Sequence, residues 1–184
     1  MKDILLVIAR AAIQSHFSGE VMDTDALLKQ YPSLNEQGAV FVTLTQDDQL
    51  RGCIGSIISH RSLLEDVIYN AKAAAFKDPR FVPLDKEELN RTRVEVSVLT
   101  PPVLLEYTDV QDLKGKIRPG IDGVILKQQN YQGTFLPQVW DDLGEFELFF
   151  SHLCQKSGLS SECLQSHPEI YTYQVEKVKE NELL

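Results

Sequence analysis

Two extended segments joined by a short polar turn constrain the fold of this chain more than any other feature. Residues 39–45 read AVFVTLT, residues 46–49 read QDDQ, and residues 50–57 read LRGCIGSI. Apolar and β-branched runs on both sides of so short a turn predict a β-hairpin, because strands joined this closely pair antiparallel. The chain is therefore predicted to contain an antiparallel sheet.

Helical segments flank this hairpin in the sequence. Residues 3–18 carry apolar side chains at helical spacing, and residues 24–30 predict a short second helix. Ser62 and Glu65 form an S-x-x-E capping box that starts a third helix, which should end near residue 77 because a proline follows at 79. Residues 145–157 predict a strongly amphipathic fourth helix.

Further strands follow the hairpin. Residues 93–99, RVEVSVL, alternate apolar and polar side chains, and residues 123–128 and 133–136 predict a second hairpin. Residues 169–178 predict one last alternating strand. Strands and helices mixed in this irregular order predict an α+β fold with a mostly antiparallel sheet flanked by helices. The regular βαβ rhythm, the G-x-G-x-x-G fingerprint and the Walker loop of nucleotide-binding folds are missing from the sequence.

Composition narrows the class of protein. The 184 residues suffice for one compact domain over 1–184, or for two small lobes within it. The formal net charge is −9, with basic residues scattered among carboxylates, so no basic face for nucleic acid is expected. The apolar run 4–9 is too short to cross a bilayer, and we expect a cytoplasmic protein that makes no membrane contact.

The cysteines and histidines predict neither a disulfide framework nor a metal site. The three cysteines, at 53, 154 and 163, are odd in number and widely spaced, which favours a reducing compartment. Cys154 falls on the apolar face of its helix and is interpreted as a core residue. The four histidines lack the spacing of a preformed zinc site, and we expect neither metal nor cofactor.

The stretch LRGCIGS, residues 50–56, is the strongest candidate for chemistry. On a regular strand Arg51, Cys53 and Gly55 point to one face, and Arg51 lies roughly 6.6 Å along the axis from Cys53. A guanidinium at that distance favours the thiolate form of a cysteine, and Gly52 and Gly55 leave room for a ligand or another backbone. The alternative is that Cys53 is a small buried hydrophobe and the glycines mark a bulge.

Other candidates have equally simple structural interpretations. Asp78 and Arg80, in KDPRF, form either a helix-terminating turn or, with Arg51, a pocket for a carboxylate or phosphate. Glu95 lies on the polar face of its strand, where it is either solvated or a general acid or base. Trp140, the single tryptophan, is expected to form a core or a cleft wall.

Six segments in order resemble one known family. They are GAVFVTL, LRGCIGSI, AKAAAFKDPRF, EVSVL, GTFLPQVW and LCQKSGL, and they run from about residue 38 to residue 159. They resemble the AmmeMemoRadiSam system protein A family, that of the human protein linked to Alport syndrome with midface hypoplasia and elliptocytosis. Ser157 stands where the family pattern leads us to expect alanine.

The resemblance implies a single α+β unit of two lobes with a cleft between them. It also implies association with a Memo-like protein and a radical S-adenosylmethionine (SAM) enzyme. The positions expected to line or support the cleft are Arg51, Gly52, Cys53, Gly55, Asp78, Arg80, Glu95, Gln138 and Trp140.

Two functions of different classes follow from these residues. In the first, the chain is a non-catalytic, accessory component, and the surface around LRGCIGS binds a ligand or a partner protein. In the second, the chain is a thiol-dependent enzyme: Cys53 is the nucleophile, Arg51 polarises it, Arg80 holds a small anionic substrate, and Glu95 is an acid or base. The sequence contains no complete catalytic constellation, which favours the first and leaves enzymatic activity undecided.

Overall fold

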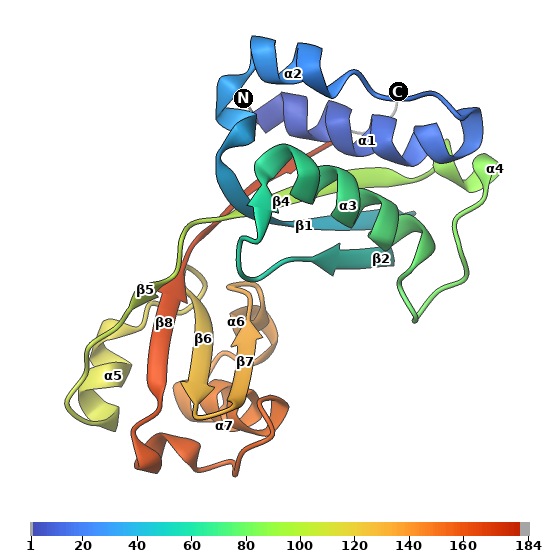
Figure 1. The fold of residues 1–184 in the computed structure, drawn as a ribbon. Coiled ribbons are helices and arrows are strands. Elements are labelled where there is room, and N and C mark those ends of the chain that lie inside the picture. The colour runs from blue at the N-terminus through green and yellow to red at the C-terminus, as the bar shows by residue number, and fades with distance from the viewer. Residues whose placement is uncertain (1, 181–184) are drawn as a thin grey trace. The chain divides into compact units, whose positions relative to one another are not determined.

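The computed structural model describes residues 2–180 and divides the chain into two compact units (Figure 1). Among the described residues, the first unit comprises 2–99 and 176–180, and the second is Thr100–Val175. Each unit has its own sheet, and every pairing with a described register is antiparallel. The α+β prediction is confirmed, and the cleft stays a prediction.

The first unit is a five-stranded sheet with helices on one face (Figure 1). The strand order is β2-β1-β4-β9, and the short strand β3 pairs with β1. Its elements are α1 (Lys2–Ser18), α2 (Thr24–Gln30), η1 (Pro32–Asn35), β1 (Gln37–Gln46), β2 (Gln49–Gly55), β3 (Arg61–Ser62), α3 (Leu63–Phe76), α4 (Lys86–Leu89), β4 (Arg93–Leu99) and β9 (Val175–Lys179).

The second unit is a four-stranded sheet of order β5-β8-β6-β7, against which α7 packs. Its aromatic core includes Trp140, Phe149 and Phe150. Its elements are β5 (Val103–Leu104), α5 (Val110–Lys116), β6 (Gly123–Gln128), β7 (Tyr131–Phe135), α6 (Val139–Asp142), α7 (Phe146–Lys156), η2 (Cys163–Ser166) and β8 (Glu169–Tyr173).

Strand alternation decides which face of the first sheet is covered. Val42 of β1 lies opposite Ile54 of β2 and Val96 of β4. Directly opposed residues project from the same face of a sheet. This row therefore joins the core formed with α1 and α3. The predicted capping box of Ser62 and Glu65 does start α3.

Helix α3 lies unusually close to β2 because small residues meet at their contact. A Cβ atom added to Gly52 would lie 2.2 Å from the carbonyl oxygen of Ala74. No side chain fits in that space, so Gly52 allows the backbones of β2 and α3 to approach each other. This close approach holds the LRGCIGS strand against the core.

One predicted strand is in fact two. Residues 169–178 were expected to form a single strand, but β8 belongs to the second sheet and β9 to the first. The break is at Gln174, which pairs with Thr100: the Gln174 amide donates to the Thr100 hydroxyl at 2.8 Å, and the Thr100 amide donates to the Gln174 carbonyl at 2.9 Å. Alternation continues across the break, so the pattern could not reveal a change of sheet.

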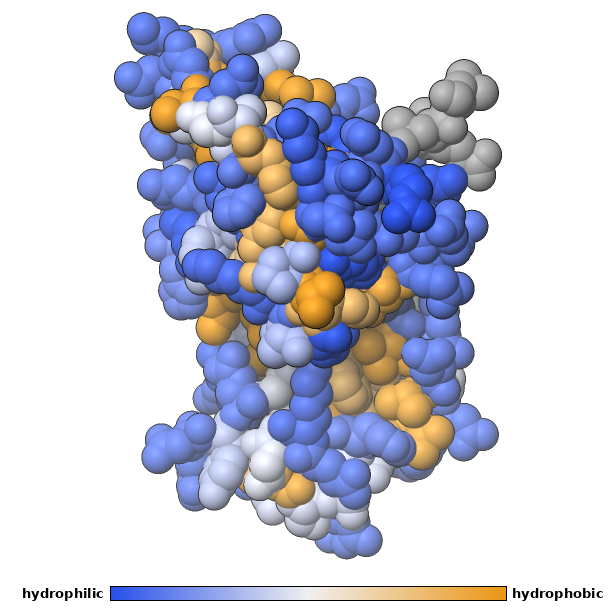
Figure 2. All heavy atoms as spheres, turned by 90° about the vertical axis from the view of Figure 1, so that its right-hand side faces the viewer, coloured by the Kyte–Doolittle hydropathy of each residue, from blue (hydrophilic) through white to orange (hydrophobic). Residues whose placement is uncertain are grey.

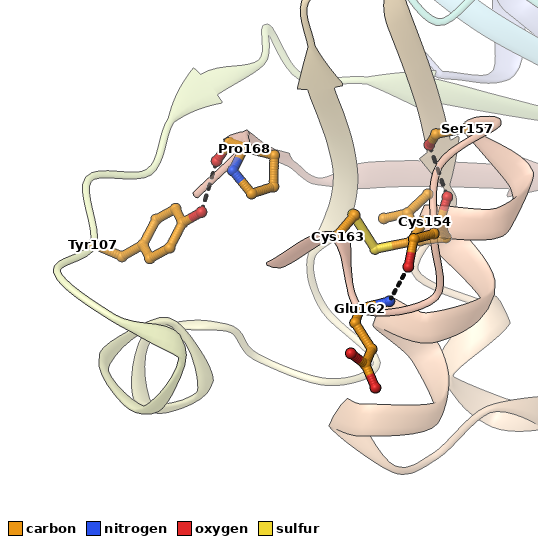
Figure 3. The surroundings of a disulfide bond; sticks show 8 residues. Tyr107, Cys154, Ser157, Glu162, Cys163 and Pro168 are labelled. Carbon is orange, nitrogen blue, oxygen red and sulfur yellow. Dashed lines mark hydrogen bonds between the residues drawn. A yellow bond between two sulfur atoms is a disulfide. The ribbon is translucent and has the colours of Figure 1, made fainter. Parts of the chain in front are cut away.

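The prediction of unpaired cysteines is wrong for two of the three. Cys154 of α7 and Cys163 of η2 form a disulfide with Cα atoms 5.8 Å apart (Figure 3). Cys154 is fully buried, as its helical position predicted. Gly158, at φ +82°, follows the end of α7, and the Leu159 amide donates to the Cys154 carbonyl. The chain reverses there and brings Cys163 under the helix. The cysteine count therefore no longer argues for a reducing compartment.

Figure 2 shows one face, on which hydrophilic side chains predominate and apolar side chains form separate patches. Over residues 2–180, no helix combines the length and apolar character needed to span a bilayer.

Replacing Gly52 by alanine tests the close contact of β2 with α3. We expect Gly52→Ala to lower the free energy of unfolding by about 1–3 kcal/mol, because the new methyl group overlaps backbone that cannot move aside freely. Urea denaturation would measure the change. Gly115→Ala is the matched control, since a Cβ at Gly115 meets nothing within 4 Å and alanine is the better helix former in α5. Equal losses in both variants would contradict the interpretation.

Candidate functional site around Cys53

A buried carboxylate organises the LRGCIGS strand. Helix α3 ends at Phe76, and Asp78 follows its C-cap and turns toward β2. The Cys53 amide donates to Oδ2 of Asp78 at 2.9 Å. The Arg80 amide donates to Oδ1 at 3.1 Å, which closes a local turn. The predicted helix-terminating turn is therefore present, and it also binds the motif strand.

Arg80 completes this clamp from the solvent side. Its Nε donates to Oδ1 of Asp78 at 3.0 Å, its Nη2 donates to Oδ2 at 2.7 Å, and Nη2 also lies 3.3 Å from the Cys53 carbonyl oxygen. The hydrogen bonds from Arg80 hold the pKa of Asp78 far below its usual range, against the opposing effect of burial. The Arg80 side chain remains 54% exposed.

The clamp replaces a missing neighbour strand. Strand β2 is at the edge of its sheet, so one side of it has no strand partner. Asp78 accepts from the Cys53 amide, and Arg80 donates to the Cys53 carbonyl. A pair of side chains thus satisfies the backbone groups that an edge strand leaves open, and it covers a position where another chain could add a strand.

Arg51 points away from Cys53, contrary to the prediction that both share a face. Leu44 pairs with Gly52 and Thr45 with Leu50, so Arg51 is the extra residue of a β-bulge. A bulge breaks strict alternation and re-aims the side chain. The glycines therefore do accompany a bulge, which was the structural alternative.

The guanidinium of Arg51 binds Glu88 of α4. Its Nε and Nη2 donate to the two carboxylate oxygens at 3.0 and 2.8 Å, and Nη2 also donates to the Val82 carbonyl at 3.0 Å. The hydrogen bonds from Arg51 lower the pKa of Glu88 to about 2. A second capping box, from Asp85 to Glu88, starts α4 and positions this carboxylate.

The two arginines of the predicted anion pocket share an aromatic contact. The Cζ atoms of Arg51 and Arg80 lie 5.8 and 5.5 Å from the centroid of the Phe81 ring. Each guanidinium already has a carboxylate partner, Glu88 for Arg51 and Asp78 for Arg80. An anion that binds here has to compete with those internal partners or to use the exposed part of Arg80.

Cys53 belongs to a polar row across three strands. Thr43 of β1 lies opposite both Cys53 of β2 and Glu95 of β4, and its Oγ1 is 3.4 Å from the Cys53 sulfur. Glu95 Oε1 lies 3.9 Å from the Lys177 ammonium of β9. Cys53 and Glu95 are two strands apart, roughly 10 Å between Cα atoms. An acid or base acts over a hydrogen-bond distance, so one substrate using both would have to span Thr43.

The space beside each glycine of the motif is occupied by other parts of the protein. Gly52 accommodates the α3 backbone, as described above. A Cβ at Gly55 would lie 2.2 Å from the Phe41 ring, so that ring occupies the space predicted for a ligand beside the sulfur. Cys53 is the free cysteine among the described residues, and it is half-buried.

A second carboxylate, which sequence reasoning missed, anchors the other end of the motif. Asp66 of α3 is fully buried; it accepts from the Ser56 hydroxyl at 2.7 Å and from the Val40 amide at 2.8 Å. Asn70 donates to the same carboxylate at 3.0 Å. An acidic residue in the first turn of a helix is usually explained by capping or by a favourable interaction with the helix dipole. Nothing in the local sequence therefore indicated these tertiary partners.

The remaining predicted site residues lie in the second unit. Trp140 is a core residue: its ring stacks on Phe149 with centroids 3.6 Å apart, and its Nε1 donates to the Asp122 carbonyl at 2.9 Å. Gln138 is exposed and precedes α6 as its N-cap. Across residues 2–180, no cluster of three or more histidine, cysteine or acidic side chains has the arrangement of a metal site.

Several known proteins are similar to this chain in sequence, and one solved structure is similar to it in fold. A family model described as AMMECR1 matches residues 6–178. Protein NEQ441 of Nanoarchaeum equitans is 38% identical over 173 residues, which cover 92% of this chain and 95% of that protein. Protein MJ0810 of Methanocaldococcus jannaschii is 37% identical over 179 residues, with 95% and 87% covered. The crystal structure of the uncharacterized protein PH0010 from Pyrococcus horikoshii matches with a TM-score of 0.85 and 36% identity over 98% of this chain and 91% of that chain.

The ion pair of Arg51 and Glu88 should make the free energy of unfolding depend on pH in the acidic range. The pKa of Glu88 falls from an ordinary 4.5 to about 2 on folding, so its contribution is present above pH 4.5 and is lost as the pH falls toward 2. We expect Glu88→Gln to cost about 3 kcal/mol at pH 7, because a mostly buried arginine loses its counter-charge. We also expect a shallower loss of stability in the variant between pH 5 and 2.

Urea denaturation at pH 7 and pH 3 would measure both effects. The matched control is Glu87→Gln, an exposed neighbour on α4, which should change neither the free energy of unfolding nor its pH dependence appreciably. An equal pH profile for Glu88→Gln and the unmodified chain would contradict the assignment.

Proposed function

The chain belongs to the AMMECR1 family, and we propose that it acts as a non-catalytic, accessory component whose surface around Cys53 binds a partner protein. The motif resemblance to AmmeMemoRadiSam system protein A suggests the partners: a Memo-like protein and a radical SAM enzyme. In this proposal the LRGCIGS strand is the rigid support, and the loop at residues 80–82 is the contact surface.

The observation that carries the proposal is that the charged side chains of the motif are paired with one another, although the buried Nη1 of Arg51 has no hydrogen-bond partner among the described residues. Asp78 accepts from Cys53 and Arg80, and Arg51 is paired with Glu88. A catalytic set needs groups that converge on the reacting atoms with hydrogen-bonding capacity to spare. Internal pairing of this kind favours a structural and binding role for the motif.

The exposed side chains next to the motif are of the types that often anchor protein interfaces. Arg80 keeps half of its side chain exposed, and Val82 is 76% exposed. Phe81 lies between them in the sequence, and its ring is near the guanidinium groups of Arg51 and Arg80. Arginine and aromatic residues are enriched among the side chains that dominate binding energy at protein interfaces. A pre-ordered arginine also loses little conformational freedom when a partner binds.

Removing the Arg80 side chain tests the proposal. We expect Arg80→Ala to weaken binding of the Memo-like protein or the radical SAM enzyme of the same organism by about tenfold or more, as for an interface hot spot. Isothermal titration calorimetry with each purified partner would measure the affinity.

Arg118→Ala is a closely matched control for this experiment. Arg118 also binds a buried carboxylate, that of Asp122, and its side chain is 55% exposed against 54% for Arg80. Both substitutions leave a buried aspartate without its arginine, so a general loss of stability would affect both alike. Failure of both proteins to bind the unmodified chain, or equal weakening by both substitutions, would refute the proposed surface.

A thiol-dependent enzyme is the second candidate, and the free thiol of Cys53 supports it. The sulfur is half-buried next to the Thr43 hydroxyl, on the polar row that includes Glu95. In this alternative Cys53 attacks a small anionic substrate, Arg80 rather than Arg51 holds its negative group, and Glu95 is an acid or base over the same face.

The alkylation rate of Cys53 separates the two candidates. The accessory role predicts that iodoacetamide modifies Cys53 of the native chain at pH 7 no faster than it modifies glutathione, because an unactivated, half-buried thiol gains no reactivity from its surroundings. Peptide mapping without reductant identifies the modified thiol, since Cys154 and Cys163 are paired. A rate tenfold or more above that of glutathione, lost in Arg80→Ala and kept in Arg118→Ala, would favour the enzyme.

A further inference from the structure

A groove outside the Cys53 surface lies between α1 and α3, which pack side by side in the first unit (Figure 1). Its volume is about 400 Å³, within the range of small-molecule sites. Residues 50–56, Asp78 and Arg80 do not line it. Its lining residues are His16 of α1, the α3 residues Glu65, Ile68, Tyr69, Lys72, Ala73 and Phe76, and Lys77.

The groove has an aromatic wall. The His16 ring stacks on Phe76, with centroids 4.0 Å apart and planes 28° from parallel. Tyr69 is 49% exposed, although it is a large hydrophobic residue. Exposed rings around a concave, mostly apolar surface favour a flat ligand that can stack or pack against them.

Basic side chains lie near the Tyr69 ring. The Arg61 Cζ lies 4.1 Å and the Lys77 Nζ lies 5.8 Å from the centroid of the Tyr69 ring. Lys72 is exposed on α3, three residues after Tyr69, and positions three apart are neighbours on a helix surface. Such a concentration of cations is notable in a chain of net charge −9.

The acidic groups near the groove are already engaged. The Glu65 carboxylate accepts from the Ser62 amide at 3.1 Å and from the Ser62 hydroxyl at 2.9 Å. Asp66, which is fully buried, lies 3.6 Å from Arg61 and offsets the charge of that arginine. Lys72 and Lys77 are therefore the cations best able to meet a negative ligand group.

We propose that this groove binds a small ligand that combines a flat apolar body with an anionic group, such as an aromatic carboxylate, sulfonate or phosphate ester. The apolar body packs against Tyr69 and Phe76, and the anionic group lies by Lys72 and Lys77. The groove between α1 and α2 provides a contrast. It has a similar volume of about 340 Å³, and among its lining residues, which include Val7, Met22 and Asp23, no basic side chain is found.

A pair of dyes with nearly the same aromatic body tests the charge requirement. 8-Anilinonaphthalene-1-sulfonate carries a sulfonate, whereas N-phenyl-1-naphthylamine is neutral, and fluorescence titration measures the affinity of each. We expect Lys72→Glu to weaken binding of the sulfonate at least fivefold and to leave binding of the neutral dye within twofold. Tyr69→Ala should weaken binding of both dyes, because the apolar wall is lost.

Lys179→Glu is the matched control, since Lys179 is an exposed residue of β9 that does not line the groove and the substitution changes the net charge equally. It should change binding of either dye by less than twofold. Circular dichroism would confirm that all variants remain folded, which is expected for exposed positions. The proposal is overturned if the sulfonate does not bind, if Lys179→Glu weakens it as much as Lys72→Glu, or if Tyr69→Ala affects neither dye.

Discussion

The hydrogen bond from the Cys53 amide to the Asp78 carboxylate is the contact on which the rest of the site depends. It joins the end of α3 to the edge strand of the sheet, at a place where a neighbouring strand would otherwise be needed. Asp66 makes a similar link from the other end of α3 to Ser56. Next to the first of these anchors, Gly52 lets the backbones of β2 and α3 come together. The motif is thereby attached to α3 and to the turn after it through residues 52, 53 and 56.

This attachment separates the motif into an inner and an outer part. Inward, the charges of Arg51 and Asp78 are matched by Glu88 and Arg80, because an unpaired charge is costly to bury. Outward, the structure leaves part of Arg80 and the half-buried thiol of Cys53. A highly specific sequence motif can therefore be needed mainly for contacts within the protein. Only part of it remains available to contact other molecules.

The two units depend on long-range connections that sequence patterns do not show. The chain enters the second unit at Thr100 and leaves it at Val175, and the Thr100–Gln174 hydrogen bonds bring these two crossings together. Within the second unit, the disulfide of Cys154 and Cys163 joins α7 to η2 (Figure 3). Both features pair residues by their position in space, so neither residue counts nor residue types could predict them.

Local side-chain patterns were enough to predict the longer helices, the first hairpin and the α+β class, because helical and strand periodicities are local. The helices at α1, α3 and α7, the hairpin of β1 and β2, and the capping box that starts α3 all follow from side-chain spacing within a few residues. Tertiary structure alone decided which charges meet. The bulge turned Arg51 toward Glu88, and the helix end brought Asp78 and Arg80 to Cys53, because these contacts join residues 25 to 37 positions apart.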